Sequence, residues 1–392
     1  MQNDEMRTKR RFLVLAAVAA AVLLLAAPRA PLSGDLLERR LSALSAPQLP
    51  PQARAPPRDD EEHHVGLLHL DASSVDEAVA AVAAGRKGIF LAGDQDARAS
   101  CPPRGFDAVV KPGAAAPCRP FVAVLVPVTS GSSRTEESEL DTSARVVEQP
   151  LFTHLLPSMA RTLAASADAG YDVAMYVGFD KGDRLWDSAA MRPKAAALAL
   201  AAAQPTLTKA PPRLRVTLLF VRCNSKNMVQ ASNCIAKRAH DDGASYSYRI
   251  NDDTELLATN WVGRFTSALQ SMRPPNVGVL GPTSDGDYAA EMDILTYDFT
   301  HRTHLLMFGW HYPPSMANWW CDNWVTDVYG DRAGVARGQV VHHTREDGRR
   351  YHVEGSPALL KDELAKGRAV LNLWLNRTGH IWTPRVGKLH AN

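Results

Sequence analysis

The sequence has no apolar run as long as the roughly 20 residues that a membrane-spanning helix usually needs. Its N-terminal apolar run, Phe12–Ala27, has 16 residues and spans roughly 24 Å at about 1.5 Å per residue. The five cysteines include no Cys-x-x-Cys pair, which argues against a structural zinc site. The formal net charge is only +2, so no strong field would steer nucleic acid, and we expect no nucleic-acid partner.

The N-terminal apolar run directly follows a cluster of basic residues between positions 7 and 11. Basic residues ahead of a span keep the N-terminus cytoplasmic and send the remainder into the lumen. A run this short suits the thinner membranes of the early secretory pathway. We therefore expect residues 1–30 to form a cytoplasmic tail and a signal-anchor helix, which would make a single-pass type II protein of the Golgi or endoplasmic reticulum membrane. Small residues at Ala27–Ala30 leave a cleaved signal peptide as the alternative.

Composition divides the rest of the chain into three parts. Residues 31–64 are rich in proline, arginine and acids without an apolar period, which indicates a flexible stem. Residues 65–117 contain a strand pattern at Leu67–Leu70 and a helix pattern at Ser74–Ala84, so they form either a small accessory β/α segment or a decoration on the next domain. Residues 118–392 are long enough for the main domain and its core.

Strand and helix patterns alternate along the first half of the main domain. Such alternation predicts an α/β fold with a doubly wound, mainly parallel sheet and helices on both faces. The predicted strands are Phe121–Val128, Val173–Val177, Leu214–Val221 and Tyr246–Ile250, and the predicted helices are Leu151–Ala165, Ala195–Ala203 and Lys226–His240.

A lumenal protein allows some cysteines to oxidise, and two pairs lie close together in the sequence. These pairs are Cys101 with Cys118 and Cys223 with Cys234, although spacing alone does not settle the pairing. A glycosylation sequon begins at Asn376, which agrees with a lumenal location.

The strand Tyr246–Ile250 alternates aromatic or aliphatic residues with polar ones, which predicts one buried face. Asn251, Asp252 and Asp253 follow it directly. Adjacent carboxylates repel each other unless a cation lies between them, and Mg²⁺ or Mn²⁺ prefers such oxygen ligands. Ligands of open α/β sheets also collect at the carboxyl ends of strands. We expect a metal–diphosphate site here; the alternative is an acidic turn in which Asp253 or Thr254 caps the next helix.

Taken in order, these pieces resemble a GT-A fold glycosyltransferase that is similar to the family 2 type, over roughly residues 119–353. The resemblance depends on an opening strand that ends in proline and a polar loop, on an acid after the second strand and on an asparagine in the helix before the fourth strand. It also depends on Asn-Asp-Asp at the Asp-x-Asp position, on a late acidic motif and on late histidines. These pieces are Val122–Thr129, Asp180, Asn233, Asn251–Asp253, Trp320–Asn323 and His342–His343.

The sequence also departs from the family pattern. Asn251 replaces the first aspartate of Asp-x-Asp, and Cys321 stands where a glutamate is common. The Gln-x-x-Arg-Trp signature of processive polysaccharide synthases is absent. Metal binding therefore depends on Asp253 and Asp252, and Asp322 is the base candidate in its motif.

The resemblance implies a nucleotide-diphosphate sugar as donor and Mn²⁺ or Mg²⁺ as cofactor. Asp253 would bind the ion, and Asp252 would share it or contact the ribose. His343 would be a late ligand, although the sequence does not separate it from His342 or from a strand end bonded to backbone. Imidazole would favour Mn²⁺. The donor would also contact Asp180, which recognises the base or else caps its loop, and Asn233 and Asn251.

Transfer needs a general base for the acceptor hydroxyl. We expect Asp322 in this role, with Asp327 as its rival, and a single displacement with inversion would follow. The alternative is that Asp322 caps a helix that begins at Asn323. Aromatic side chains stack on sugar rings, but most tryptophans pack in cores. The candidates for the acceptor site are Trp310, Trp319 and Trp320.

The expected function is a metal-dependent, hexosyltransferase-like glycosyltransferase with a glycan, glycoprotein or glycolipid acceptor in the secretory lumen. One alternative is a non-catalytic lumenal lectin or scaffold on the same fold. Another is a metal-dependent nucleotidyltransferase, for which Ser130–Arg134 is only a faint match to a phosphate loop. An aspartyl-phosphate phosphatase has acids at a different spacing from Asn251–Thr254.

Overall fold

The computed structural model describes residues 64–70, 121–130, 149–165, 171–188, 216–225, 227–285, 293–344, 355–386 and 388–391. The predicted anchor, stem, Cys101–Cys118 pair and helix Ala195–Ala203 lie outside these residues. Across the described part of the chain, no helix combines the length and the apolar character needed to cross a membrane.

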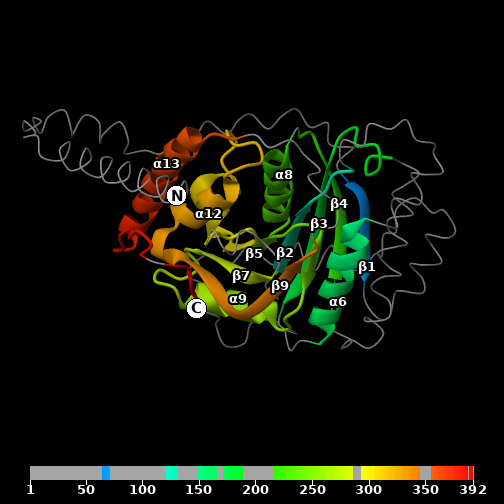
Figure 1. Cartoon of the computed structure of the whole chain (residues 1–392), viewed down its shortest axis with the longest axis horizontal. Coiled ribbons are helices and arrows are strands. Elements are labelled where there is room, and N and C mark those ends of the chain that lie inside the picture. The colour runs from blue at the N-terminus through cyan, green and yellow to red at the C-terminus, as the bar shows by residue number, and fades with distance from the viewer. Residues whose placement is uncertain are drawn as a thin grey trace, which may run out of the picture. The chain divides into compact units, whose positions relative to one another are not determined.

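One sheet of ten strands organises the main domain (Figure 1). Its order is β1-β4-β3-β2-β5-β8-β7-β9-β10, and β6 pairs with β9 beside this path. The strands are β1 (His64–Leu70), β2 (Phe121–Pro127), β3 (Asp172–Asp180), β4 (Val216–Cys223), β5 (Tyr246–Arg249), β6 (Thr254–Leu256), β7 (Val279–Asp285), β8 (Asp298–His301), β9 (Ala333–His343) and β10 (His390–Ala391).

The centre of this sheet is parallel, as the sequence predicts. β4, β3, β2 and β5 all run in one direction, and β8 is antiparallel to β5. β7, β9 and β10 continue as parallel neighbours. The predicted strand near Leu67 is β1, which pairs antiparallel with β4 at the sheet edge. This strand therefore belongs to the main sheet.

The helices cover both faces of the sheet, which confirms the doubly wound prediction. Alternate residues of β2 belong to two different core clusters. The cluster that contains Val122 packs against the helix α6 (Leu156–Ala164), and the cluster that contains Ala123 packs against α8 (Met228–Asp241). Figure 1 shows α6 and α8 on opposite sides of β2 and β3. A π-helical turn, η1 (Leu151–Leu155), leads into α6, and α9 (Trp261–Ser271) packs on the same face as α6.

A separate cluster of helices covers the far half of the sheet. It comprises α11 (Thr303–Phe308), α12 (Cys321–Val328) and α13 (Pro357–Arg377), and α12 and α13 lie side by side (Figure 1). A short 3₁₀ turn, η2 (Gly330–Arg332), joins α12 to β9. Asn376 of the sequon is exposed in the last turn of α13.

The bond between Cys223 and Cys234 is present, which confirms one of the two expected disulfides. It fastens the end of β4 to the middle of α8.

The prediction of one buried face for β5 is wrong. All four residues of this strand are buried, including Ser247 at 6% exposure and Arg249 at 3%. The reason is that β5 is a central strand between β2 and β8, with a hydrophobic core cluster on one face and α8 against the other. The alternating pattern of β5 therefore marks two faces that are both buried, one apolar and one polar.

The winding of the chain reverses between β2 and β5. The chain leaves β2 through α6 to β3 on one side, and it returns from β4 through α8 to β5 on the other side. Crossovers that diverge in this way leave a crevice at the carboxyl ends of the two strands, where α/β proteins bind ligands. Asn251–Asp253 follows β5 at this point.

Candidate active site

The carboxyl edge of the sheet brings together an aspartate and a histidine that are 90 positions apart in the sequence. β6 pairs with the end of β9 so that Thr254 lies opposite His343. This register places the Asp253 Oδ2 atom 3.2 Å from the His343 Nε2 atom. The backbone nitrogen and hydroxyl of Thr344 both donate to the Asp253 carbonyl oxygen at 3.0 Å, which fixes the turn. The structure therefore unites two of the predicted metal ligands.

Carboxylate oxygen and imidazole nitrogen form a donor set that suits Mn²⁺. The two side chains are 20% and 19% exposed, so they stand at the boundary between core and solvent. Among the described residues, no group of three or more His, Cys, Asp or Glu side chains gathers to hold a metal ion. Mg²⁺ and Mn²⁺ keep water ligands and accept phosphate oxygens readily. The pair fits an ion that a diphosphate would help to bind.

The neighbouring candidates have different surroundings. Asp252 is 3% exposed, so its carboxylate turns into the protein, whereas Asn251 is partly exposed. His342 lies 3.7 Å from Asp285, and these side chains are 42% and 71% exposed. The structure thus separates the two late histidines: His343 lies at Asp253, and His342 does not.

Asp180 ends β3, at the same edge of the sheet as the end of β2. The hydroxyl of Ser225 donates to its carboxylate. Burial, together with the negative charge of Asp183, raises the pKa of Asp180 to about 6. Asp183 accepts hydrogen bonds from the backbone nitrogens of Ser130, Leu185 and Trp186, and thereby ties the loops after β2 and β3 together.

Asp322 lies in the first turn of α12 and is partly exposed. The helix begins at Cys321, and Trp320 holds the preceding position with a φ angle of 72° and no side-chain cap. Asp322 is therefore inside the helix, and the alternative that it caps a helix starting at Asn323 is wrong. A bulky residue with positive φ is strained, and such strain clusters at functional sites. The rival base Asp327 lies 3.4 Å from Arg385 of the C-terminal segment.

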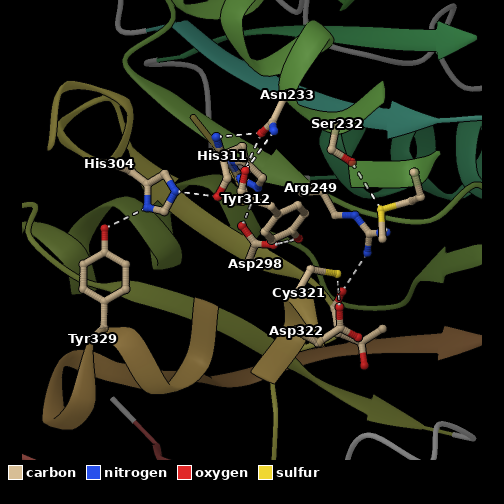
Figure 2. Close-up of polar contacts among 12 residues, drawn as sticks. Ser232, Asn233, Arg249, Asp298, His304, His311, Tyr312, Cys321, Asp322 and Tyr329 are labelled. Atoms are coloured by element: carbon tan, nitrogen blue, oxygen red, sulfur yellow. Dashed lines mark hydrogen bonds and ion pairs between the residues drawn. The ribbon is translucent and has the colours of Figure 1, made fainter. Parts of the chain in front are cut away.

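A buried polar network, missed by the sequence reasoning, joins β8 to the loop after α11 (Figure 2). Asp298 lies 2.9 Å from His311, both side chains are fully buried, and the Tyr312 hydroxyl donates to the same carboxylate. Burial raises the pKa of Asp298, but the charge and hydrogen bond of His311, the Tyr312 hydroxyl and Arg249 outweigh it, and the net shift is downward. The sequence signal for this network was weak, because Arg249 and Asp298 end or begin short strands that also contain other polar residues.

Asn233 supports this network. Its side-chain oxygen accepts from the backbone nitrogens of His311 and Tyr312 at 2.9 Å, and its amide donates to the Tyr312 carbonyl at 2.8 Å (Figure 2). The side chain that the resemblance assigns to the donor thus holds a loop in the structure.

The tryptophans divide between surface and core. Trp319 is 42% exposed, and Trp320 is partly exposed beside it. Trp310 packs against the helical core cluster. The backbone at Gly355 approaches Trp319 and Trp320 so closely that an added Cβ would meet them within 3.0 Å.

No protein-family model matches the chain, and no curated protein matches it. Its structure is similar to that of a putative nucleotide-diphospho-sugar transferase from Desulfovibrio desulfuricans G20, with 13% identity over 46% of this chain and 64% of that chain and a TM-score of 0.25. It is also similar to S. aureus TarS, with 12% identity over 66% of this chain and 43% of that chain and a TM-score of 0.36. A fragment of TarS in complex with UDP gives 12% identity over 66% and 71% of the two chains and a TM-score of 0.36.

Proposed function

We propose that the protein is a metal-dependent glycosyltransferase that moves a sugar from a nucleotide-diphosphate sugar to a glycan, glycoprotein or glycolipid acceptor. The observation that carries this proposal is the 3.2 Å contact between Asp253 and His343 at the carboxyl edge of the sheet, where the connections that follow β2 and β5 run in opposite directions. An oxygen and a nitrogen ligand at the carboxyl edge of a parallel sheet meet the needs of a cation that grips a diphosphate.

Asp253 and His343 would hold Mn²⁺ or Mg²⁺ in this mechanism. The ion, when bound, supplies Lewis-acid stabilisation of the charge on the leaving diphosphate. Asp252, expected to share the ion or contact the ribose, is only 3% exposed, so we assign the ion to Asp253 and His343 alone. Asp180 would meet the nucleoside base, since it lies at the same sheet edge at the end of β3.

Asp322 would take the proton from the acceptor hydroxyl, because it is the partly exposed carboxylate at the start of α12. Attack from the side opposite the diphosphate would invert the anomeric centre. Trp319 offers an exposed ring next to this position, on which an acceptor sugar would stack.

The proposed location is the lumen of the Golgi or endoplasmic reticulum, with the chain anchored by its N-terminal segment. The support for this location is the basic cluster that precedes the apolar run Phe12–Ala27. The exposed Asn376 agrees with a lumenal domain.

The two adjacent histidines provide a matched test of the metal site. The full-length wild type is expected to gain thermal stability with UDP or GDP only when Mn²⁺ is present. His343→Gln should weaken Mn²⁺ affinity by roughly tenfold or more. His342→Gln is the control and should behave as the wild type, because its partner is Asp285. Equal losses in both variants would contradict the assignment of His343.

Two carboxylate variants separate donor binding from transfer. Asp253→Asn should abolish the Mn²⁺-dependent shift with nucleotide. Asp322→Asn should keep that shift while the release of nucleoside diphosphate in a donor screen falls by roughly 10²- to 10⁴-fold. A wild type that neither shifts with any nucleotide nor turns over any donor would sink the enzyme proposal and favour the lectin or scaffold.

A further inference from the structure

A cleft with a volume of about 680 Å³ lies apart from the proposed active site. It is formed by the end of α9, the turn η2 and the residues that follow α13, and its lining includes Met272, Arg273, Asp331, Arg332, Ile381 and Thr383. Arg332 directly precedes the first residue of β9, and His343 is the last residue of that strand. β9 has 11 residues, so at about 3.3 Å per residue the cleft and the proposed metal pair lie roughly 35 Å apart along the strand.

Two arginines line this cleft, and neither forms an ion pair with the described residues. The guanidinium of Arg332 donates no hydrogen bond to this part of the chain, and its Nε atom is buried. The Nη1 atom of Arg273 lies 3.5 Å and 3.4 Å from the carbonyl oxygens of Ser271 and Met272, which is long for a hydrogen bond. Buried donors without a partner are rare in proteins, so such a donor commonly marks a place for a water or an ion.

The acid in the lining does not neutralise the arginines. The Asp331 carboxylate accepts a hydrogen bond from the Thr383 hydroxyl, and it forms no ion pair within the described part of the chain. Burial lowers the pKa of Arg332, and the charge of Asp331 only partly offsets this effect. Two arginines against one aspartate leave the lining with a net positive charge, which attracts anions.

The walls of the cleft are fixed without a ligand. The indole nitrogen of Trp382 donates to the Val328 carbonyl oxygen at 2.9 Å, and the backbone nitrogen of Asp331 donates to the Thr383 carbonyl oxygen at 3.2 Å. Gly330, with a φ angle of 62°, lies so close to the Thr383 carbonyl oxygen that a Cβ would not fit. The chain that follows α13 is therefore held against η2. Walls that are ordered in advance lower the entropic cost of binding a ligand.

We propose that this cleft binds an oxyanion, the phosphate or sulfate group of a small ester, between Arg332 and Arg273. A guanidinium group presents its N–H donors in a planar fork that matches the oxygens of such groups. The volume of about 680 Å³ exceeds that of one phosphate group, so the organic part of the ester has room beside Met272 and Ile381. The site is separate from sugar transfer and does not depend on the proposed function.

Inorganic phosphate and inorganic sulfate are the probes, added to the full-length protein with a chelator present and the ionic strength held constant with NaCl. At least one of them should raise the melting temperature to a plateau, and the anion with the lower Kd in titration calorimetry identifies the ester class. Arg332→Met should weaken binding of that anion by roughly 10- to 100-fold, because it removes charged hydrogen bonds. Arg337→Met, at an exposed arginine of β9 outside the lining, is the control and should keep the wild-type Kd. Failure of both anions to bind, or equal losses in the two variants, would overturn the proposal.

The melting temperature of Arg332→Met separates a ligand site from a structural arginine. Without anions this variant should melt at or above the wild-type temperature, because the substitution removes a buried donor that has no partner. With saturating anion it should melt below the wild type, which alone gains from binding. A decrease of the same size under both conditions would show that Arg332 serves the fold alone and would refute the site.

A variant of the proposed metal pair excludes binding of the anion at that pair. Asp253→Asn should keep the wild-type anion affinity, because Asp253 lies beside His343 at the other end of β9. Loss of binding in Asp253→Asn, with Arg332→Met unchanged, would place the anion at the metal pair and refute the cleft site. A wild type without transferase turnover would refute the proposed function alone, since no sugar donor enters these titrations.

Discussion

The fold contains two aspartate–histidine pairs with the same chemistry that differ in burial. Asp253 and His343 are 3.2 Å apart and 20% and 19% exposed. Asp298 and His311 are 2.9 Å apart and both fully buried. The surroundings of such a pair, more than its residue types, therefore determine whether it stabilises the fold or binds a ligand.

The buried pair is closed to ligands by its own partners. The Tyr312 hydroxyl donates to the second carboxylate oxygen of Asp298, and three hydrogen bonds with the Asn233 side chain hold the 311–312 backbone. A neighbouring bond has the same structural character: the His304 ring contacts the His311 carbonyl oxygen at 2.8 Å. The partly exposed pair instead stands at the sheet edge where an ion has access. We therefore expect the first pair to control folding and the second to control ligand binding.

The largest expected effect comes from breaking the buried pair. Asp298→Ala should lower the free energy of unfolding by about 3–5 kcal/mol, because it leaves buried cationic and polar groups uncompensated. Asp253→Ala should cost no more than about 1 kcal/mol in the same denaturant titration, because solvent screens a partly exposed pair. Asp285→Ala, at a carboxylate that is 71% exposed, is the control. Equal costs for Asp298→Ala and Asp253→Ala would break the distinction between the pairs.

A smaller effect is expected at the loop that supports the buried pair. Asn233→Ala removes three hydrogen bonds and should cost roughly 1–3 kcal/mol, mainly through the buried backbone groups that it leaves unpaired. Asn233→Asp keeps the oxygen that accepts from the nitrogens of His311 and Tyr312 but loses the donor to the Tyr312 carbonyl oxygen, so it should recover only part of this cost. Both variants should bind nucleotide with Mn²⁺ as the wild type does, within error, by titration calorimetry. If a variant stays stable but loses nucleotide affinity, Asn233 contacts the donor, as the family resemblance implies.

The sequence predicted the partly exposed pair, Asp253 and His343, better than the buried pair, Asp298 and His311, for a physical reason. Asp253 follows a strongly patterned strand, and parallel strands gather their carboxyl ends at one edge, so its role follows from local order. The Asp298–His311 contact depends instead on how β8 packs against the loop after α11, and no local period encodes this packing. The alternation of β5 was visible, but it does not distinguish a solvated face from a buried polar one, and so the burial of Arg249 was missed.

For the rest of the fold, long elements with a clear period were predicted from the sequence, and short elements were not. Long periodic elements were predicted nearly in full: β2 and α8 match their predicted bounds within two residues. β6 and β8 have three and four residues, too few to show a period. Sequence also could not place Trp320 at positive φ, since that conformation is imposed by the packing around the start of α12.

The smallest expected effect concerns Asp180, a third carboxylate at the carboxyl edge of the sheet. It tests how burial changes the cost of a charge. Burial and the charge of Asp183 raise the pKa of Asp180 from 3.8 to about 6. Between these values the unfolded chain ionises at position 180 while the folded protein keeps its proton, so this group loses stability as pH rises from about 4 to about 6. Above pH 6 the loss is constant. Because Asp180 is only half-buried, we expect a loss of roughly 1 kcal/mol.

Asp180→Asn should therefore be more stable than the wild type at pH 7.5, and the two proteins should converge toward pH 4. The asparagine keeps an oxygen that accepts from the Ser225 hydroxyl, so the change isolates the charge. Denaturant midpoints across this range measure the difference. Ser225→Ala is the control, since it removes the hydroxyl but leaves the carboxyl in place, and it should retain the wild-type decline with pH. A difference between Asp180→Asn and wild type that is constant from pH 4 to 7.5 would show that the carboxyl at position 180 ionises alike in the folded and unfolded chains.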